Sequence, residues 1–475
     1  MKNVFTKLIY IISIISFAFF TYILLKNRLF PWNYRIAFFS VMGVLFLAAG
    51  ILIFRDKLQG KAKFAVAVLL CLALAVNAAG GYYVKKSMDM LDKINVKSPE
   101  TVTMSVVVPV SSRINEMDAA LDEKIEAPVE RDGENTDRFV AAVKETYTKT
   151  AELIDCGSYF EGANRILTGE SHIMLLNEAY RSIIEEQMPD FAKKTRVVGS
   201  IQLAGEKSPA KEKEDEPGEP FSIYLSGIDT YGDLTKVSRS DTNLILSVNP
   251  NTKKVLITTV PRDTYLPIAG GGNGEYDKLT HSGIYGIDSS IETVENFLGI
   301  KIDYYARINF TSLIEIVDVL GGIDVENEEE FTTVDDQYFE QGIIHLDGKR
   351  ALRFAQERDS LSDGDIGRGR NHERIIKAIL QKMQSKEILL HYEGVMDVIY
   401  RSMDTNISKE LVIDMINKQL KSGTSWQIDM AEISGTGTTG LTSYAMPGYD
   451  LYVMVPDEES VADVKSRINE LLRGK

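Results

Sequence analysis

Three long apolar stretches without a charged residue lie near the start of the chain. They cover residues 8–25, 36–54 and 64–84. Helical stretches of about 18 to 21 residues span roughly 30 Å of hydrocarbon, the thickness of a bilayer core. A cleaved signal peptide has a shorter apolar core and a small-residue cleavage site, and neither is clear here. We therefore predict three transmembrane helices in residues 1–89.

Basic residues in the short connections predict the orientation of these helices. Before the third stretch, Arg55, Lys57, Lys61 and Lys63 outnumber Lys26 and Arg28, which follow the first stretch, and Lys2 and Lys7 lie at the start of the chain. Lysine and arginine accumulate on the cytoplasmic side of a membrane. We predict a cytoplasmic N-terminus, so that three crossings place residue 85 and everything after it outside the cell.

A charged segment with almost no apolar residue divides the rest of the chain. "AGEKSPAKEKEDEPGEP" has the composition of a solvated linker. The block before it combines a β-branched run, "TVTMSVVVPV", with two helical stretches and the late strand "TRVVGSIQL". We predict a small accessory α/β domain in residues 99–203, a linker in 204–219 and a larger domain in 220–475.

Strand and helix patterns alternate in the larger domain. "PFSIYLSGID" and "NLILSVNPNTKKVLITTV" indicate three strands, of which the last two are joined by an Asn-Pro-Asn-Thr turn. "SSIETVENFLG" and "TSLIEIVDVLGG" read as helices that end at glycine. This alternation predicts an α/β/α sandwich with a mixed central sheet, in which ligand sites gather at strand ends.

The charge of the chain is divided as sharply as its hydropathy. Residues 1–89 hold eleven Lys and Arg against two Asp, a net charge of +9, whereas the whole chain carries −15, so the remainder carries −24. Such an acidic body excludes nucleic acid as a partner, because backbone phosphates require a broad positive surface.

The sequence contains two cysteines. Cys71 lies in the third apolar stretch, and Cys156 is the single cysteine after it, so the part of the chain outside the membrane cannot form an intrachain disulfide.

Charged residues recur at the ends of the three predicted strands. Asp229 ends the first, "RSDT" with Arg239 and Asp241 begins the second, and "PRDT" with Arg262 follows the third. Antiparallel pairing of the second and third strands brings all four residues to one edge. Two carboxylates about 4 Å apart repel by roughly 4 kcal/mol at an effective dielectric of 20 unless a cation separates them. Oxygen ligands favour Mg²⁺ or a relative, and arginine favours phosphate, which together indicate a diphosphate site. The alternative is a set of surface salt bridges beside turns.

A second basic group lies in "QERDSLSDGDIGRGRNHERIIK". It contains Arg358, Arg368, Arg370, Arg374 and Lys377 in a glycine-containing loop that runs into a helix. Helix N-termini attract anions, and a screening length of about 8 Å allows a local cluster to bind one despite the acidic body. Arg374 and Lys377 are equally compatible with a solvated helix face.

Together, these motifs resemble the LytR-CpsA-Psr (LCP) family over nearly all of residues 220–460. The segments that carry the resemblance are "GIDT", "RSDT", "PRDT", "DKLTHSGIYG", "DYYARINF", "VDVLGGIDV", "LDGKRALRFAQER", "DGDIGRGRNHERI" and "YDLYVMVPDEESV". Three membrane helices and an accessory domain before this domain resemble the capsule-type members of Gram-positive bacteria. Such a protein is a multi-pass cell-membrane protein whose C-terminal domains are extracellular.

The resemblance implies a phosphotransferase that acts outside the membrane. Its donor is a glycopolymer, capsular or teichoic-acid-like, on an undecaprenyl diphosphate carrier, and its acceptor is peptidoglycan. The resemblance implies Mg²⁺, or Mn²⁺, on Asp229 and Asp241, and catalytic roles for Asp241 and Arg262. The diphosphate-binding residues it implies are Arg239, Arg262, Lys278, Gln356, Arg358, Arg368, Arg370 and His372. Apolar positions of the same domain form a tunnel for the polyprenyl chain.

Two positions depart from the family pattern. Gln356 stands where an arginine is expected, and His372 stands where a glutamine is expected. The loss of one cation from a desolvated diphosphate clamp costs on the order of 1.5 to 3 kcal/mol of binding. Arg370 or protonated His372 is the candidate for compensation.

Two other functions fit the same residues. A polyprenyl-diphosphate phosphatase uses the same clamp with water as acceptor, so its turnover does not depend on peptidoglycan. A noncatalytic lipid-diphosphate-binding protein of cell-wall assembly binds the lipid without turnover, and Gln356 favours that alternative.

Overall fold

The computed structural model describes most of the chain, which forms two compact units. The described residues are 2–27, 32–54, 60–94, 100–205, 218–231, 233–385, 388 and 392–474. The first unit comprises Met1–Val96, Asp215–Gly218 and Ile407–Ser425, and the second comprises Lys97–Glu214, Glu219–Asn406 and Trp426–Lys475. The basic residues Arg28, Arg55 and Lys57 and residues 206–217 of the predicted linker lie outside the described residues.

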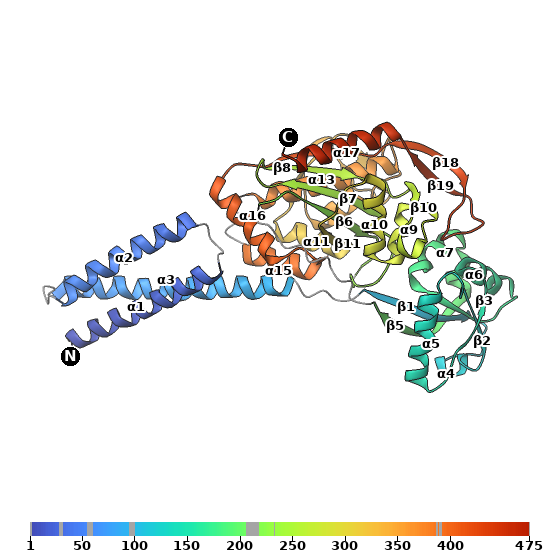
Figure 1. The fold of residues 1–475 in the computed structure, drawn as a ribbon, viewed down its shortest axis with the longest axis horizontal. Helices are drawn as coiled ribbons and strands as arrows, with labels where there is room; N and C mark the ends of the chain where they lie inside the picture. The colour runs from blue at the N-terminus through green and yellow to red at the C-terminus, as the bar shows by residue number, and fades with distance from the viewer. Residues whose placement is uncertain are drawn as a thin grey trace. The chain divides into compact units, whose positions relative to one another are not determined.

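The first unit contains the three predicted apolar helices. They are α1 (Lys2–Asn27), α2 (Trp32–Phe54) and α3 (Gly60–Ile94), drawn in blue in Figure 1, and α1 packs against both of the others. Within them, Phe5–Asn27, Trp32–Phe54 and Lys61–Lys86 are long and apolar enough to cross a membrane. The three helices predicted from the sequence are confirmed, and each begins earlier than the apolar stretch that predicts it.

A five-stranded sheet in residues 101–204 forms the accessory domain of the second unit. Its strand order is β3-β2-β4-β1-β5, and β1 (Thr101–Pro109) is antiparallel to both neighbours. Val106 and Val108 of β1 face one core, and Val107 faces another. Burial on both faces explains why Val106, Val107 and Val108 form an uninterrupted apolar run. The other elements are α4 (Met117–Ala120), β2 (Lys124–Ala127), α5 (Gly133–Tyr147), β3 (Glu152–Asp155), α6 (Tyr159–Thr168), β4 (Met174–Asn177), α7 (Arg181–Gln187), α8 (Asp190–Lys194) and β5 (Thr195–Ala204).

The larger domain is built on a six-stranded sheet of order β16-β11-β6-β7-β8-β17. The central strand β7 is antiparallel to both β6 and β8, whereas β11 is parallel to β6 and β17 is parallel to β8. The sheet is therefore mixed, as the sequence predicts. Its strands are β6 (Phe221–Ile228), β7 (Thr242–Asn249), β8 (Lys254–Thr259), β11 (Tyr304–Asn309), β16 (Asp404–Thr405) and β17 (Gln427–Glu432).

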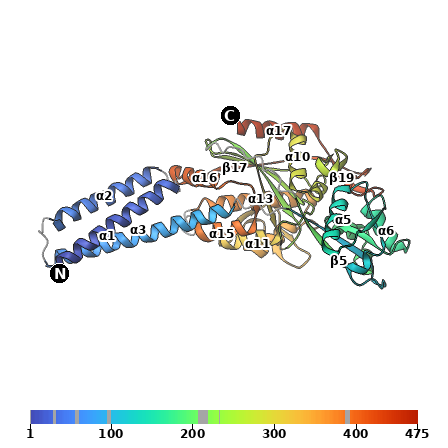
Figure 2. The same cartoon turned by 60° about the horizontal axis from the view of Figure 1, so that its bottom comes forward.

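Helices cover both faces of this sheet. On one face, Tyr224 and Ile245 pack in one core with α10 (Ile287–Leu298) and α17 (Glu458–Leu472). On the other face lie α11 (Phe310–Val319), α12 (Gly348–Gln356), α13 (Asp365–Met383) and α15 (Tyr392–Ser402), which share a second core. Figure 2 shows the two layers of helices with the sheet between them. The smaller elements are β9 (Tyr265–Pro267), β10 (Tyr276–Lys278), α9 (Leu279–Ser282), β12 (Ile323–Asn327), β13 (Phe331–Thr332), β14 (Tyr338–Phe339), β15 (Gly342–Leu346), β18 (Gly435–Leu441) and β19 (Leu451–Pro456).

Residues 407–425 belong to the first unit, although the sequence predicts a single domain for 220–475. They include helix α16 (Lys409–Ser422). Residues 101–204, by contrast, belong to the same compact unit as the six-stranded sheet.

An apolar core joins the accessory domain to the larger domain within the second unit. Ile183 and Ile184 of α7 pack in the same cluster as Val237 and Ile284 of the larger domain. A shared core of this kind holds the two domains together as one folded body. It also holds α7 against the loop that leads from β6 to β7.

Candidate active site

Three strand ends bring the predicted charged residues together. Asp229 follows β6, Asp241 precedes β7, and Arg262 lies shortly after β8. Gly227 of β6 pairs with Thr242 of β7 in the antiparallel register. Leu244 of β7 likewise pairs with Thr259 of β8, so the predicted antiparallel pairing of the second and third strands is confirmed, and the three charged residues lie at one edge of the sheet.

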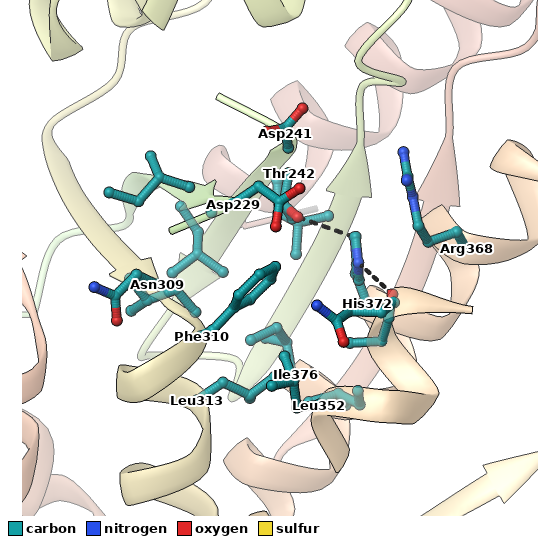
Figure 3. Close-up of a pocket in the computed structure, with 18 of the residues that line it drawn as sticks. Asp229, Asp241, Thr242, Asn309, Phe310, Leu313, Leu352, Arg368, His372 and Ile376 are labelled. Atoms are coloured by element: carbon teal, nitrogen blue, oxygen red, sulfur yellow. Dashed lines mark hydrogen bonds between the residues drawn. The ribbon is translucent and has the colours of Figure 1, made fainter. Parts of the chain in front are cut away.

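A cavity of about 240 Å³ opens at this edge. In Figure 3, Asp229, Asp241 and Arg368 lie at one end of it, and Leu313, Leu352 and Ile376 lie at the other. A pocket with an apolar floor and a few polar groups at its mouth suits a ligand with an anionic head and a hydrocarbon tail. The polar lining is Asp229, Asp241, Thr242, Arg262, Asn309, Gln356, Arg368 and His372, and the apolar lining includes Leu225, Ile228, Leu244, Ile308, Phe310, Leu313, Leu352, Ala355, Ile375 and Ile376.

Helix α13 contributes side chains from one of its faces to the lining of the cavity. Arg368, His372 and Ile376 stand four residues apart, which places them one above another on a helix. Phe310 begins α11, whose N-terminus is capped by the side chain of Asn309 accepting a hydrogen bond from the Ser312 amide at 2.9 Å. Regular elements therefore fix both the charged end and the apolar end of the cavity.

Asp241 is kept ionised by neighbouring cations. Its carboxylate accepts hydrogen bonds from Arg262 and, at 3.2 Å, from the Thr280 hydroxyl. Burial alone raises the pKa of Asp241, but the charges of Arg262 and Arg239 outweigh burial and lower that pKa below its ordinary value. Asp241 is therefore a carboxylate at physiological pH.

Asp229 experiences the opposite balance. Burial raises its pKa, and the negative charge of Asp241 raises it further, against the lowering effect of Arg239 and Arg262. Two carboxylates that repel each other at one end of a cavity fit a divalent cation, because Mg²⁺ takes one or two carboxylates and completes its shell with phosphate oxygens and water. In the described part of the chain, no group of three or more His, Cys, Asp or Glu side chains could hold a metal ion. The pair alone thus fits an ion that shares its shell with substrate.

All the cations predicted to bind diphosphate pair with carboxylates. Arg262 bonds Asp241 inside the cavity. An incoming diphosphate therefore meets charges that are already balanced, and it must displace carboxylates or bring a cation. The other pairs are Arg239–Glu186 (3.0 Å), Lys278–Asp263 (2.8 Å), Arg358–Asp359 (3.1 Å), Arg368–Asp365 (2.5 Å) and Arg370 with Asp363 (2.7 Å) and Glu432 (3.1 Å).

Six of the ten predicted site residues line the cavity, and four lie outside its lining. The six are Asp229, Asp241, Arg262, Gln356, Arg368 and His372; the four are Arg239, Lys278, Arg358 and Arg370. Arg239 nevertheless acts on the pKa of both Asp229 and Asp241. The Arg358 and Arg370 side chains are 54% and 41% exposed, so these two face solvent.

His372 is neutral, so it does not replace the missing cation. Its Nε2 donates to the Ala355 carbonyl at 2.9 Å, which leaves Nδ1 to accept from the Thr242 hydroxyl at 3.1 Å. Burial and the nearby charge of Arg368 lower the pKa of His372 to about 4. Compensation by protonated His372, which the sequence leaves open, is therefore not what this geometry supports.

Four polar or aromatic residues around the site are absent from the residues selected by sequence. Thr242 and Thr280 hydrogen-bond His372 and Asp241, while Asn309 and Phe310 line the cavity. Both threonines lie inside quoted motifs, "RSDT" and "DKLTHS", but the selection followed charge. In the sequence, Phe310 looks like an ordinary core residue at the start of a helix. The sequence holds no signal that distinguishes a core residue from one that lines a cavity.

Comparison with known proteins gives one extensive family match. The model described as LytR_cpsA_psr family matches residues 191–466, more than half of the chain. A second model, described as DNA polymerase processivity factor, matches residues 60–176. That range is less than half of the chain and joins α3 to part of the accessory sheet, so we draw no function from it.

Two curated relatives and a solved structure illustrate the similarity. Polyisoprenyl-teichoic acid–peptidoglycan teichoic acid transferase TagU of Bacillus anthracis is 37% identical over 198 residues, 42% of this chain and 64% of that protein. TagU of Halalkalibacterium halodurans is 33% identical over 256 residues, 54% of this chain and 80% of that protein. The chain thus spans less than two thirds of the Bacillus anthracis relative. The crystal structure of B. subtilis TagV is 28% identical, with a TM-score of 0.47 over 54% of this chain and 98% of that one.

Proposed function

Because the chain belongs to the LytR-CpsA-Psr family, we propose that it transfers a glycopolymer from an undecaprenyl diphosphate carrier to peptidoglycan. Relatives carry the name of polyisoprenyl-teichoic acid–peptidoglycan teichoic acid transferases, which supports a teichoic acid as the polymer. A capsular polysaccharide is the alternative polymer. The observation that carries the proposal is the amphiphilic cavity, whose mouth holds two carboxylates and two arginines above an apolar floor.

The apolar floor is the place for the polyprenyl chain. Leu244, Phe310 and Leu352 come from a strand and two helices, so hydrocarbon surrounds this end of the cavity on several sides. Each methylene that leaves water contributes about 0.8 kcal/mol. Burial of the first isoprene units therefore anchors the donor and directs its diphosphate toward the charged end.

Arg262 and Arg368 are the cations that would touch the diphosphate. Both line the cavity, and their planar donors match phosphate oxygens. Asp229 and Asp241 would hold Mg²⁺ or Mn²⁺, which when bound neutralises charge on the phosphate oxygens. Arg262 also fixes Asp241 through their hydrogen bond, so one arginine serves both the substrate and the carboxylate.

The transfer step is an in-line attack by a sugar hydroxyl of peptidoglycan on the sugar-proximal phosphorus. A new P–O bond forms to the acceptor oxygen as its proton passes to water, directly or by way of Asp229 or Asp241, while the P–O bond of the diphosphate breaks and polyprenyl monophosphate leaves. Charge develops on the phosphoryl and leaving oxygens, and preorganised donors at that position provide most of the catalysis of phosphoryl transfer. Arg262 and Arg368 are these donors here.

The membrane helices fit this substrate, because a polyprenyl carrier diffuses in the same bilayer. We propose that the three apolar helices anchor the chain with its N-terminus in the cytoplasm. The catalytic domain then lies outside, where peptidoglycan is found.

Transfer is tested with the full chain in nanodiscs, a synthetic polyprenyl-diphosphate glycan and peptidoglycan oligomers, with and without Mg²⁺. Glycan attached to peptidoglycan only in the presence of metal, and lost in Asp241→Ala and Arg262→Ala, is the expected result. Release of glycan phosphate without an acceptor identifies a phosphatase, and tight lipid binding without turnover identifies a noncatalytic protein. Full transfer by Arg262→Ala contradicts the proposed role of that arginine.

A further inference from the structure

The accessory domain places a carboxylate on one of the predicted diphosphate arginines. Glu186 of α7 lies with its Oε2 3.0 Å from Nη1 of Arg239. The Arg239 side chain is only 13% exposed, whereas that of Glu186 is 56% exposed. The pair thus joins a nearly buried cation of the catalytic loop to an anion at the rim.

The position of Glu186 is fixed by packing. Ile183 and Ile184 precede it by less than one helical turn and are buried. They belong to the core that joins the two domains, to which the larger domain contributes Val237. The hydroxyl of Tyr180, at the start of α7, donates to the hydroxyl of Tyr285 at 3.3 Å. Helix α7 is therefore anchored to the larger domain through residues that precede Glu186, and Glu186 is part of the wall around Arg239.

The loop that carries Arg239 is fixed as well. A Cβ at Gly283 would lie 2.5 Å from the carbonyl oxygen of Ser238 and 2.6 Å from the amide nitrogen of Ser240, so the loop packs directly on glycine backbone. The Ser240 amide donates to the Thr280 carbonyl at 3.1 Å. Arg239 thus projects from a backbone held on both sides.

Arg239 stands between two sets of negative charge. Its charge lowers the pKa of Asp229 and Asp241 on the cavity side. Glu186 faces it from the accessory side, and the charge of Glu186 also acts on Arg262. A diphosphate near Arg239 and Arg262 therefore experiences the repulsion of Glu186 and competes with it for the Arg239 donors.

We propose that Glu186 is part of the substrate site and sets how tightly the diphosphate is held. This inference rests on the proposed function, and it adds Arg239, whose charge acts on both cavity carboxylates, to the cations that meet the diphosphate. When the site is empty, Glu186 keeps a nearly buried cation paired, which stabilises the free state. When the diphosphate enters, the same carboxylate opposes it, which weakens binding and speeds the departure of the phosphate product. The accessory domain thereby contributes a residue that tunes affinity.

The test measures the binding of farnesyl diphosphate, and separately of farnesyl monophosphate, to the full chain in detergent micelles at fixed Mg²⁺ by calorimetry. Removal of the charge in Glu186→Gln is expected to tighten both affinities about five-fold, the size of a partly exposed charge interaction. Unchanged or weaker binding by Glu186→Gln overturns the inference.

A matched control variant and a double variant test whether Glu186 changes the affinity through Arg239. Glu185→Gln removes a neighbouring charge that pairs with Arg181 inside α7, and it is expected to leave the affinity unchanged. In the Arg239→Gln background, the further change Glu186→Gln is expected to give less than a two-fold gain. If Glu186→Gln still tightens the affinity five-fold in the Arg239→Gln background, Glu186 does not act by competing for Arg239.

The wild-type chain separates this inference from the proposed function. If the wild type binds farnesyl diphosphate but Glu186→Gln binds it equally, only the inference fails. If the wild type binds neither farnesyl ligand, the diphosphate site itself is wrong, and the inference fails with it.

Discussion

The strand-end residues and the arginine-rich segment after α12 both offer cations, yet their surroundings differ. Arg262 lies in the cavity wall and bonds the buried Asp241. Arg358 and Arg370 are about half exposed and pair with acidic neighbours of the same segment or the sheet edge. Buried, geometrically fixed charges interact strongly, whereas exposed pairs are screened by water and salt. The comparison teaches that position relative to the cavity, and not the density of arginine in the sequence, selects the functional cations.

The largest effect is expected from Asp241→Asn. The amide removes the negative charge that pairs with Arg262 and that would help to hold Mg²⁺, so both the metal and the arginine lose their partner. Loss of one such group costs about a hundredfold to a thousandfold in turnover. Transfer rates in nanodiscs measure the effect, with circular dichroism to confirm folding. A well-folded Asp241→Asn variant within tenfold of the wild-type rate contradicts the role of the strand ends.

The second-largest effect is expected from Arg368→Gln, on the cavity face of α13. Arg368 is 16% exposed and lines the cavity, so its loss removes charge-assisted hydrogen bonds to the diphosphate. Such bonds contribute about 1.5–3 kcal/mol each, or roughly ten- to a hundredfold in affinity. Calorimetric titration with farnesyl diphosphate measures it. An affinity within twofold of the wild type removes Arg368 from the clamp.

The sequence predicts the strand-end half of the site well, for physical reasons. Alternating apolar runs with a short turn define β7 and β8, and antiparallel pairing then leaves no other place for Asp241 and Arg262. The mixed sheet and the three apolar helices follow from equally local patterns. These features depend on residues that are near one another in the chain, and a local sequence pattern contains that information.

The arginine-rich half of the site is less predictable, because the direction in which each arginine points depends on where the helix begins. Arg368 and Arg370 are two residues apart, so about 200° of helix rotation separates them, and only one can face the cavity. That choice could be read from the apolar face of α13 through Ile375 and Ile376 once the helix start is known. The Glu186–Arg239 contact joins positions 53 residues apart in two domains, and no local pattern contains it.

Glu373, next to His372 on α13, extends the comparison to a buried carboxyl that forms no ion pair with any of the described residues. Burial raises its pKa to about 7 from an ordinary 4.5, and one carboxylate oxygen has no hydrogen-bond partner. The unfolded chain releases this proton near pH 4.5 and the folded chain only near pH 7, so stability is lost as pH rises through this interval, by on the order of 3 kcal/mol.

Glu373→Gln is therefore expected to raise the thermal midpoint at pH 8 and to leave it nearly unchanged at pH 4.5. Thermal unfolding of the full chain in detergent at both pH values measures the difference. Glu330→Gln, at an exposed carboxylate that accepts a hydrogen bond from Tyr338, is the control. An equal shift at both pH values would show that Glu373 is not the group that titrates.

The smallest effect is expected from Arg370→Gln, the direct counterpart of Arg368→Gln on the same helix. Arg370 keeps Asp363 and Glu432 as partners, lies outside the cavity lining and is 41% exposed, so a diphosphate gains little from its charge. We expect less than a threefold change in farnesyl diphosphate affinity, which is the scale of an exposed ion pair. A loss as large as that of Arg368→Gln would mean that the first turns of α13 rearrange when substrate binds and carry Arg370 to the phosphate. The ratio of the two losses thus measures whether the clamp is built before the substrate arrives.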